Sequence, residues 1–149
     1  MEKKDQSLRN RAFRLLARRE YGRVELSRLL SEHAESPEAL TSLLDQLVDD
    51  GYQSDERFVE SFVRSRVSQG KGTNRIRNEL QQRGVSAELV ADKMTSAEVD
   101  WFELAKAQRV KKFGREAAKD AKLKAKYMRF LLYRGFTQEQ CRYAIEDTQ

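Results

Sequence analysis

An internal repeat is the feature that most constrains what this chain can fold into. Arg-Gly-Val-Ser at 83–86 returns 51 residues later as Arg-Gly-Phe-Thr at 134–137. Apolar residues stand at matching places before each copy: Ile76 and Leu80 in one, Tyr127 and Leu131 in the other. A glycine tolerates the positive φ that ends a helix, and a following Ser or Thr caps the next one. Each copy therefore predicts two helices joined by a tight turn.

A weaker copy occupies the first third of the chain, where Leu26 and Leu30 precede Ser-Pro-Glu at 36–38. A further helical segment precedes each copy, and the three segments are 11–19, 58–66 and 101–109. We therefore expect an all-α fold of three tandem three-helix modules, at 1–52, 53–95 and 96–149. A module of about 50 residues is marginal alone. We accordingly expect the modules to stabilise one another by packing together in an elongated, curved helical repeat.

Helix-breaking residues support this division. All seven glycines fall between predicted helices: Gly22, Gly51, Gly70, Gly72, Gly84, Gly114 and Gly135. The single proline, Pro37, stands at the first position of a predicted helix, where its missing N–H is not needed. Within helices the apolar residues recur every three or four positions, which is typical of an amphipathic helix.

The inventory of reactive side chains argues against an enzyme. His33 and Cys141 are the only histidine and cysteine among the 149 residues, too few for a His-based relay or a Cys/His metal site. A carboxylate-only metal site stays open, although no acidic spacing matches an EF-hand. Gly-Lys-Gly-Thr at 70–73 lacks the first glycine and the preceding strand of a P-loop. We expect no catalysis and no cofactor.

Hydropathy and cysteine content indicate the compartment. The longest apolar run is four residues, Phe130 to Tyr133, far short of a membrane span. No apolar segment follows the charged N-terminus, so the sequence predicts no secretory signal. A lone cysteine cannot form an internal disulfide, which fits a reducing compartment. We expect a cytoplasmic protein that does not enter membranes.

Basic residues gather in two windows, although the formal net charge is only +5. Residues 64–83 hold six basic residues and one acid, and residues 104–134 hold eleven basic residues and two acids. Two interpretations stay open, a solvated helix surface and a surface that faces a polyanion. The scarcity of acids favours the second. The candidate contact residues are Arg64, Arg66, Lys71, Arg75, Arg77, Lys111, Lys112, Lys122, Lys126 and Arg129.

For several aromatic and reactive residues, the sequence favours a structural role over a functional one. Trp101 aligns with Phe58, which favours core packing over base stacking, and Cys141 aligns with Val90 as a small buried residue. His33 lies near a helix end, where a polar surface residue is expected. Both Tyr127 and Tyr133 are expected to cover the core rather than stack on bases.

Several motifs resemble those of a known family. The stretch 47–66, which begins Leu-Val-Asp-Asp-Gly-Tyr, and the stretch 70–85, which begins Gly-Lys-Gly-Thr-Asn-Arg, are similar to the central signature of the bacterial RecX regulatory proteins. Arg-Gly-Phe-Thr at 134–137 resembles their C-terminal motif, and Glu25-Leu26 their N-terminal one. Thr73-Asn74 is a departure, because many members carry a proline-containing pair there.

The resemblance implies a fold and a function. RecX proteins are all-α and consist of three-helix modules. They modulate RecA, mainly as inhibitors: they bind the RecA filament on single-stranded DNA, along its groove, and suppress ATPase, strand exchange and co-protease activity. This role belongs to the regulation of DNA repair, recombination and the SOS response. The implied partners are the RecA filament and single-stranded DNA, contacted directly or through the filament, and we expect a monomer.

Two other functions remain open. The first is direct DNA binding of the helix-turn-helix type, because the segments 24–33 and 36–48 are compatible with the helix pair of such a protein. The second predicted helix, 37–49, has three acids and no basic residue, which suits a groove reader poorly. The chain also fits a protein-interaction scaffold whose basic windows face solvent or an acidic protein.

Overall fold

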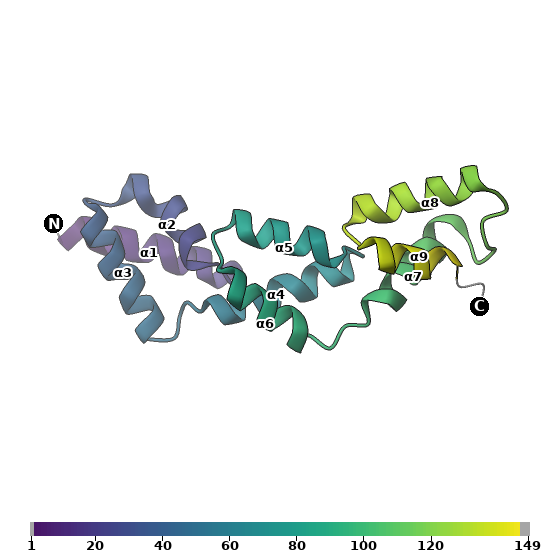
Figure 1. The fold of residues 1–149 in the computed structure, drawn as a ribbon. Coiled ribbons are helices and arrows are strands. Elements are labelled where there is room, and N and C mark those ends of the chain that lie inside the picture. The colour runs from purple at the N-terminus through teal and green to yellow at the C-terminus, as the bar shows by residue number, and fades with distance from the viewer. Residues whose placement is uncertain (1, 147–149) are drawn as a thin grey trace. The chain divides into compact units, whose positions relative to one another are not determined.

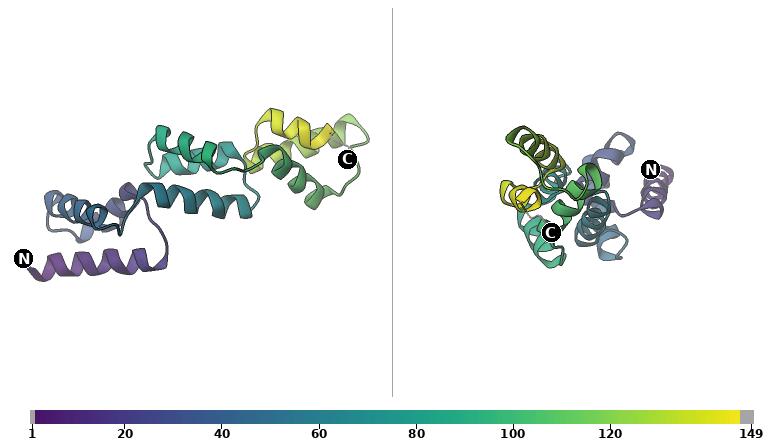
Figure 2. Two further views of the ribbon diagram at one scale, coloured as in Figure 1. Left: turned by 90° about the horizontal axis from the view of Figure 1, so that it is seen from below. Right: turned by 90° about the vertical axis from the view of Figure 1, so that its right-hand side faces the viewer.

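The computed structural model describes residues 2–146, with side chains from residue 6 onward. Within that range the chain is all-α, as the repeat predicts, and holds no strand (Figure 1, Figure 2). The helices are α1 (Glu2–Arg18), α2 (Arg23–Leu30), η1 (Ser31–His33), α3 (Pro37–Asp49), α4 (Asp55–Ser68), α5 (Thr73–Gln82), α6 (Ala87–Ser96), α7 (Trp101–Phe113), α8 (Ala121–Arg134) and α9 (Gln138–Glu146).

The chain divides into two compact units. The first unit consists of residues up to 61 together with 80–93, and the second consists of 62–79 together with residues from 94 onward. Each unit therefore takes part of the middle helices α4, α5 and α6. The division into modules at 1–52, 53–95 and 96–149 remains our proposal. In the described residues these ranges hold α1 to α3, α4 to α6 and α7 to α9, except that α6 ends at Ser96, one residue past the second range.

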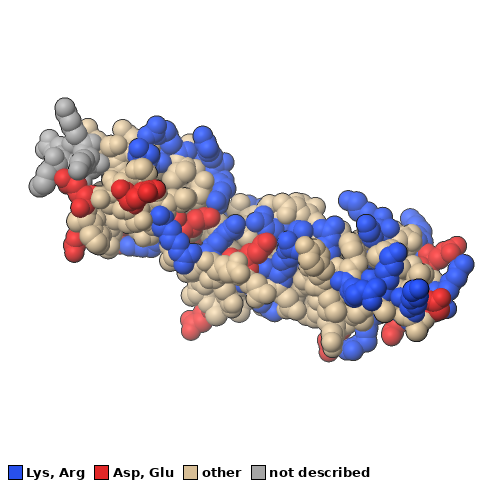
Figure 3. Space-filling model, turned by 90° about the horizontal axis from the view of Figure 1, so that it is seen from above, with Lys and Arg blue, Asp and Glu red and all other residues tan. Residues whose placement is uncertain are grey.

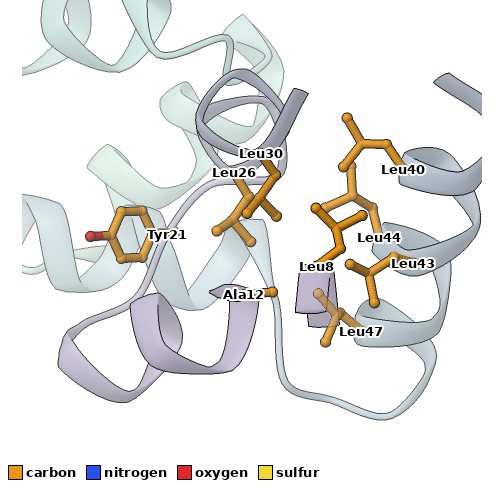
Figure 4. Close-up of a cluster of buried hydrophobic side chains, with 9 residues drawn as sticks. All are labelled: Leu8, Ala12, Tyr21, Leu26, Leu30, Leu40, Leu43, Leu44 and Leu47. Carbon is orange, nitrogen blue, oxygen red and sulfur yellow. The ribbon is translucent and has the colours of Figure 1, made fainter. Parts of the chain in front are cut away.

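Leucines dominate the core of the first unit (Figure 4). The leucines of α2 and α3 point toward Leu8 and Ala12 of α1. The buried residues of this cluster are Leu8, Ala12, Tyr21, Leu26, Leu30, Leu40, Leu43, Leu44 and Leu47. Burial of one such leucine contributes roughly 1.5–3 kcal/mol relative to exposure. The apolar period of three to four residues therefore explains why these helices pack together.

The core of the second unit is more aromatic. Its buried cluster comprises Ala105, Tyr127, Leu131, Phe136, Cys141, Ala144 and Ile145. Phe113 stacks on Tyr127 with ring centroids 4.2 Å apart. The interpretations of Tyr127 and Cys141 as core residues are thereby confirmed, and His33 is exposed as expected.

The repeated turn forms in both copies as the sequence predicts. Gly84 and Gly135 take φ values of +82° and +103°. The next residue, Val85 or Phe136, donates its N–H to the carbonyl of the residue five places back at 3.2 Å. This bond pattern closes a helix at a left-handed glycine. Thr137 then caps α9, because its Oγ1 accepts from the N–H of Gln140 at 3.1 Å.

Each turn also packs against the start of an earlier helix. In the first unit, a Cβ added to Gly84 would collide with the side chain of Val24 at the start of α2. In the second unit, a Cβ added to Gly135 would collide with Arg75 near the start of α5. The glycine is thus needed for close approach as well as for positive φ. The same joint therefore occurs once in each unit.

The predicted equivalence of Trp101 with Phe58 does not hold in the structure. The same alignment places the next residue, Phe102, opposite Val59, but Phe102 is 39% exposed. Counted from the first residue of each helix, Val59 corresponds instead to Ala105, and both are fully buried. Trp101 becomes the first residue of α7 and is only half-buried.

Candidate anion-binding surface

All ten candidate contact residues lie in the second unit. Arg66, Lys71 and Arg75 are half-buried, and the other seven are exposed. Over α8, lysine and arginine side chains crowd the surface and acidic side chains are few (Figure 3).

Arg66 and Arg75 converge on one carboxylate. Arg66 Nε lies 2.8 Å from Glu79 Oε2, and Arg75 Nε lies 3.6 Å from Glu79 Oε1. The guanidinium of Arg66 also covers the ring of Phe62, 4.1 Å from its centroid. Glu79 therefore holds two arginines of α4 and α5 in place and neutralises only one of their charges.

Lys71 joins this group. The pKa of its ammonium is lowered from the ordinary value, first by burial and then by the positive charges of Arg75 and Arg134. Both causes act against the protonated form. A cation whose charge is opposed by neighbouring cations gains most from an arriving anion.

Arg134 is the residue that the sequence-based candidate list omitted. Its Nη1 donates to the carbonyl of Gln69 at 3.2 Å, so it reaches the turn between α4 and α5 from the end of α8. Its sequence signal was its place at the edge of the 104–134 window, in the repeated Arg-Gly pair. The Arg-Gly pair predicts a turn, but it does not predict which loop the arginine reaches.

Phenylalanines connect Arg134 to the cations of the second window. The guanidinium of Arg134 lies 5.3 Å from the centroid of Phe130, and Lys112 Nζ lies 5.9 Å from the same centroid. Phe113 packs edge-on against Phe130 at 5.3 Å, and Lys126 Nζ lies 5.9 Å from Phe113. Arg134 therefore belongs to both groups, and the two basic windows meet at this residue.

A row of four side chains runs along α8. Lys122, Lys126, Arg129 and Tyr133 stand at i, i+4, i+7 and i+11, which places them on one side of the helix. All four are exposed, and Tyr133 is 77% exposed. The expectation that Tyr133 covers the core is therefore wrong, because the buried side of α8 is formed by Tyr127 and Leu131. We call these four residues the α8 row.

Three candidates lie apart from these groups. Arg77 follows Arg75 by two positions, which places it on nearly the opposite side of α5. Arg64 is exposed on α4 and makes no ion pair with any other described residue. Lys111 lines a separate surface hollow with Lys106 and Arg115.

Arg109 is a basic residue of the second window that does not reach the surface. It is 1% exposed and donates to three backbone carbonyls: Ala144 at 3.0 Å, Gly114 at 2.7 Å and Glu116 at 3.3 Å. Its role is to tie α7 to α9 and to the loop before α8. Its guanidinium is therefore engaged by backbone carbonyls within the second unit.

The described residues offer little else for chemistry. Residues 2–146 contain no group of three or more His, Cys, Asp or Glu that could hold a metal ion. Burial raises the pKa of the Cys141 thiol to about 11, so it is a poor nucleophile at neutral pH. Among the described helices, none has both the length and the hydrophobicity that a membrane-spanning segment requires.

Family models match two segments of the chain. Residues 54–94 match the model described as RecX, second three-helix domain, and residues 98–145 match RecX, third three-helix domain. The first segment holds α4 to α6 up to residue 94, and the second holds α7 to α9 up to residue 145.

Whole-chain relatives and solved structures agree with these matches. The regulatory protein RecX of Chromohalobacter salexigens is 43% identical over 145 residues, which cover 97% of this chain and 95% of that protein. That of Acinetobacter baylyi is 42% identical over 138 residues, covering 93% and 86%. The crystal structure of RecX from Lactobacillus salivarius superposes with a TM-score of 0.83 at 18% identity, covering 99% and 98% of the two chains, and therefore supports the fold. On the sequence matches, the chain belongs to the RecX family of regulatory proteins.

Proposed function

We propose that this protein binds RecA filaments on single-stranded DNA and inhibits them without catalysis. Inhibition would extend to ATP hydrolysis, strand exchange and co-protease activity, and thereby regulate DNA repair, recombination and the SOS response. The observation that carries the proposal is the meeting of the two basic windows at Arg134, in a chain of the RecX family.

The arrangement suits a polymeric anion better than a small one. Lys126 lies beside Phe113, and Lys112 and Arg134 lie beside Phe130, which packs against Phe113. Arg134 in turn acts on the charge of Lys71. A surface of this kind makes several weak contacts at once, which favours a filament over a free protomer. Contacts to more than one RecA protomer would hold the protomers in a state unsuited to ATP turnover or exchange.

A helix-turn-helix DNA reader is the main alternative. It would need its second helix to carry basic side chains into a groove. On α3 the charged side chains are Glu38, Asp45 and Asp49, all exposed, and none is basic. A scaffold function is the second alternative, and it predicts no response to single-stranded DNA.

Binding to preformed filaments tests the proposal. We would label the full chain and measure its anisotropy with RecA on oligo-dT and a slowly hydrolysed ATP analogue. Arg75→Glu is expected to weaken binding at least tenfold and Arg77→Glu much less, because only Arg75 belongs to the group at Glu79. Arg14→Glu, which makes the same charge change on α1 of the first unit, is the control.

The salt dependence gives a second measurement. Lys126→Ala is expected to reduce the slope of log affinity against log salt by about one if the lysine contacts a phosphate. Filament binding that is unchanged in Arg75→Glu at moderate salt, with normal helicity, would contradict the proposed site. Absence of binding by the wild-type chain would contradict the proposed function.

A further inference from the structure

Tyr133 is the side chain whose placement the fold leaves unexplained. Its exposed fraction of 77% is well above the 51% of Tyr52, another exposed aromatic residue. Tyr52 packs edge-on against Phe13 at 4.9 Å, so its ring is part of the first unit's structure. Tyr133 contributes little to its own core, whose α8 residues are Tyr127 and Leu131.

Arg75 positions a cation beside this ring. Its guanidinium lies 5.5 Å from the centroid of Tyr133, and its Nη1 donates to the backbone carbonyl of Tyr133 at 3.4 Å. The Glu79 carboxylate pairs with the same guanidinium, with Oε1 3.6 Å from Arg75 Nε. Arg75 is thus fixed next to an open aromatic face, and the arrangement is not that of a freely solvated lysine or arginine.

The rest of the α8 row supplies charges in line with the ring. Lys122 lies eleven residues before Tyr133, which is about 16 Å along a helix. Lys126 and Arg129 lie between them on the same side. A cationic track that ends at an exposed aromatic ring has the two elements that proteins use to hold single strands, namely charges for the backbone and a ring for a base.

We propose that Tyr133 stacks directly on a base of single-stranded DNA, while Lys122, Lys126 and Arg129 contact the phosphates next to it and Arg75 supports the ring. The inference rests on the proposed function for its setting and adds that the DNA is touched directly and not only through RecA. Stacking is tolerant of sequence because every base has a π-face. Duplex DNA has its base faces covered, so single strands are the preferred ligand.

The test uses the full chain without RecA and fluorescent oligo-dT. Tyr133→Ala is expected to bind about tenfold more weakly, because it removes the ring on which a base would stack. Tyr133→Phe keeps the ring and is expected to bind like the wild type. Leu132→Ala, which removes an exposed apolar side chain from the neighbouring position on α8, is the matched control and is expected to bind normally.

Heparin, a polyanion without bases, separates stacking from charge. Tyr133→Ala is expected to bind heparin as tightly as the wild type does. Equal losses for heparin and oligo-dT would overturn the proposal, because the ring would then act only by arranging the cations. Unchanged oligo-dT binding in Tyr133→Ala, or no binding by the wild type, would also overturn it.

A spectroscopic signature adds a direct readout. In the double variant Trp101→Phe/Tyr133→Trp, the only tryptophan stands at position 133, and stacking on a base is expected to quench its fluorescence. A signal unaffected by saturating oligo-dT would argue against the stack. Filament binding, measured separately with RecA present, distinguishes failure of this inference from failure of the proposed function.

Discussion

Gly72 donates its backbone N–H to the carbonyl oxygen of Arg134 at 2.9 Å, and so joins the turn before α5 to the end of α8. Two residues later, Asn74 donates to the carbonyl of Gly135 at 2.8 Å. These bonds are between backbone atoms, so they fix the relative position of the two segments within the second unit. They also explain why Arg75, Lys71 and Arg134 come together.

Gly135→Ala is expected to destabilise the protein by about 3 kcal/mol. A positive φ costs a non-glycine residue roughly 1–2 kcal/mol, and the added Cβ would also collide with Arg75. Gly51→Ala is the control, because Gly51 has a φ of +80° but open space around a Cβ, and it is expected to lose only about 1 kcal/mol. Urea denaturation followed by circular dichroism measures both, and equal losses would contradict the role of Gly135 in the joint.

Arg109→Met is expected to cost about 2–3 kcal/mol, because it leaves buried backbone acceptors such as the Ala144 carbonyl without their donor. Lys111→Ala, an exposed neighbour on α7, is expected to change stability by less than about 0.5 kcal/mol. Thermal unfolding of both variants checks the difference. If Arg109→Met were as stable as the wild type, the three carbonyl contacts of Arg109 would not stabilise the fold.

Glu79→Gln is expected to strengthen binding to oligo-dT several-fold and to steepen its salt dependence, because it removes the charge that offsets Arg66 and Arg75. Stability should fall by less than about 1 kcal/mol, as is usual for partly exposed ion pairs. Glu88→Gln makes the same change in net charge on α6 of the first unit and is expected to leave binding nearly unaltered. Weaker binding by Glu79→Gln would show that the carboxylate serves the surface only by positioning the two arginines.

Cys141 is expected to resist thiol reagents at pH 8 until the protein unfolds, because it is fully buried and the pKa of its thiol is raised to about 11. The folded state holds this proton more tightly than the unfolded state, whose pKa is near 9.0. The contribution to the free energy of unfolding is therefore constant below pH 9 and falls as the pH rises from 9 toward 11.

Cys141→Ala should lose this part of the pH dependence, which urea titrations of the two proteins at pH 8 and pH 10.5 would compare. Rapid labelling of the native wild-type protein at pH 8 would show that the thiol is accessible after all.

Local signals in the sequence were sufficient to predict the helices and the turns between them. Gly84 and Gly135 end their helices because positive φ is nearly restricted to glycine, and the predicted caps at Ser86 and Thr137 accept hydrogen bonds as expected. The buried partners Leu80 and Leu131 follow from the same apolar period.

Contacts between segments far apart in the sequence could not be predicted from such local signals. In the sequence, Arg109 looks like any other basic residue of its window, because nothing nearby shows that it will donate to a backbone carbonyl of α9. Tyr133 is predicted to lie in the core because it ends the apolar run Phe130 to Tyr133, although its spacing of four residues from Arg129 puts it on the basic side of α8. The link from Arg134 to the turn at Gln69 depends on a joint that spans 65 residues.

The most direct measurement of the central claim is the ATPase activity of RecA on single-stranded DNA, titrated with this protein well below one copy per RecA. We predict loss of most ATP hydrolysis at such ratios, and a much weaker effect of Arg75→Glu at the same concentration. Full ATPase activity in the presence of excess wild-type protein would contradict the claim for the RecA tested.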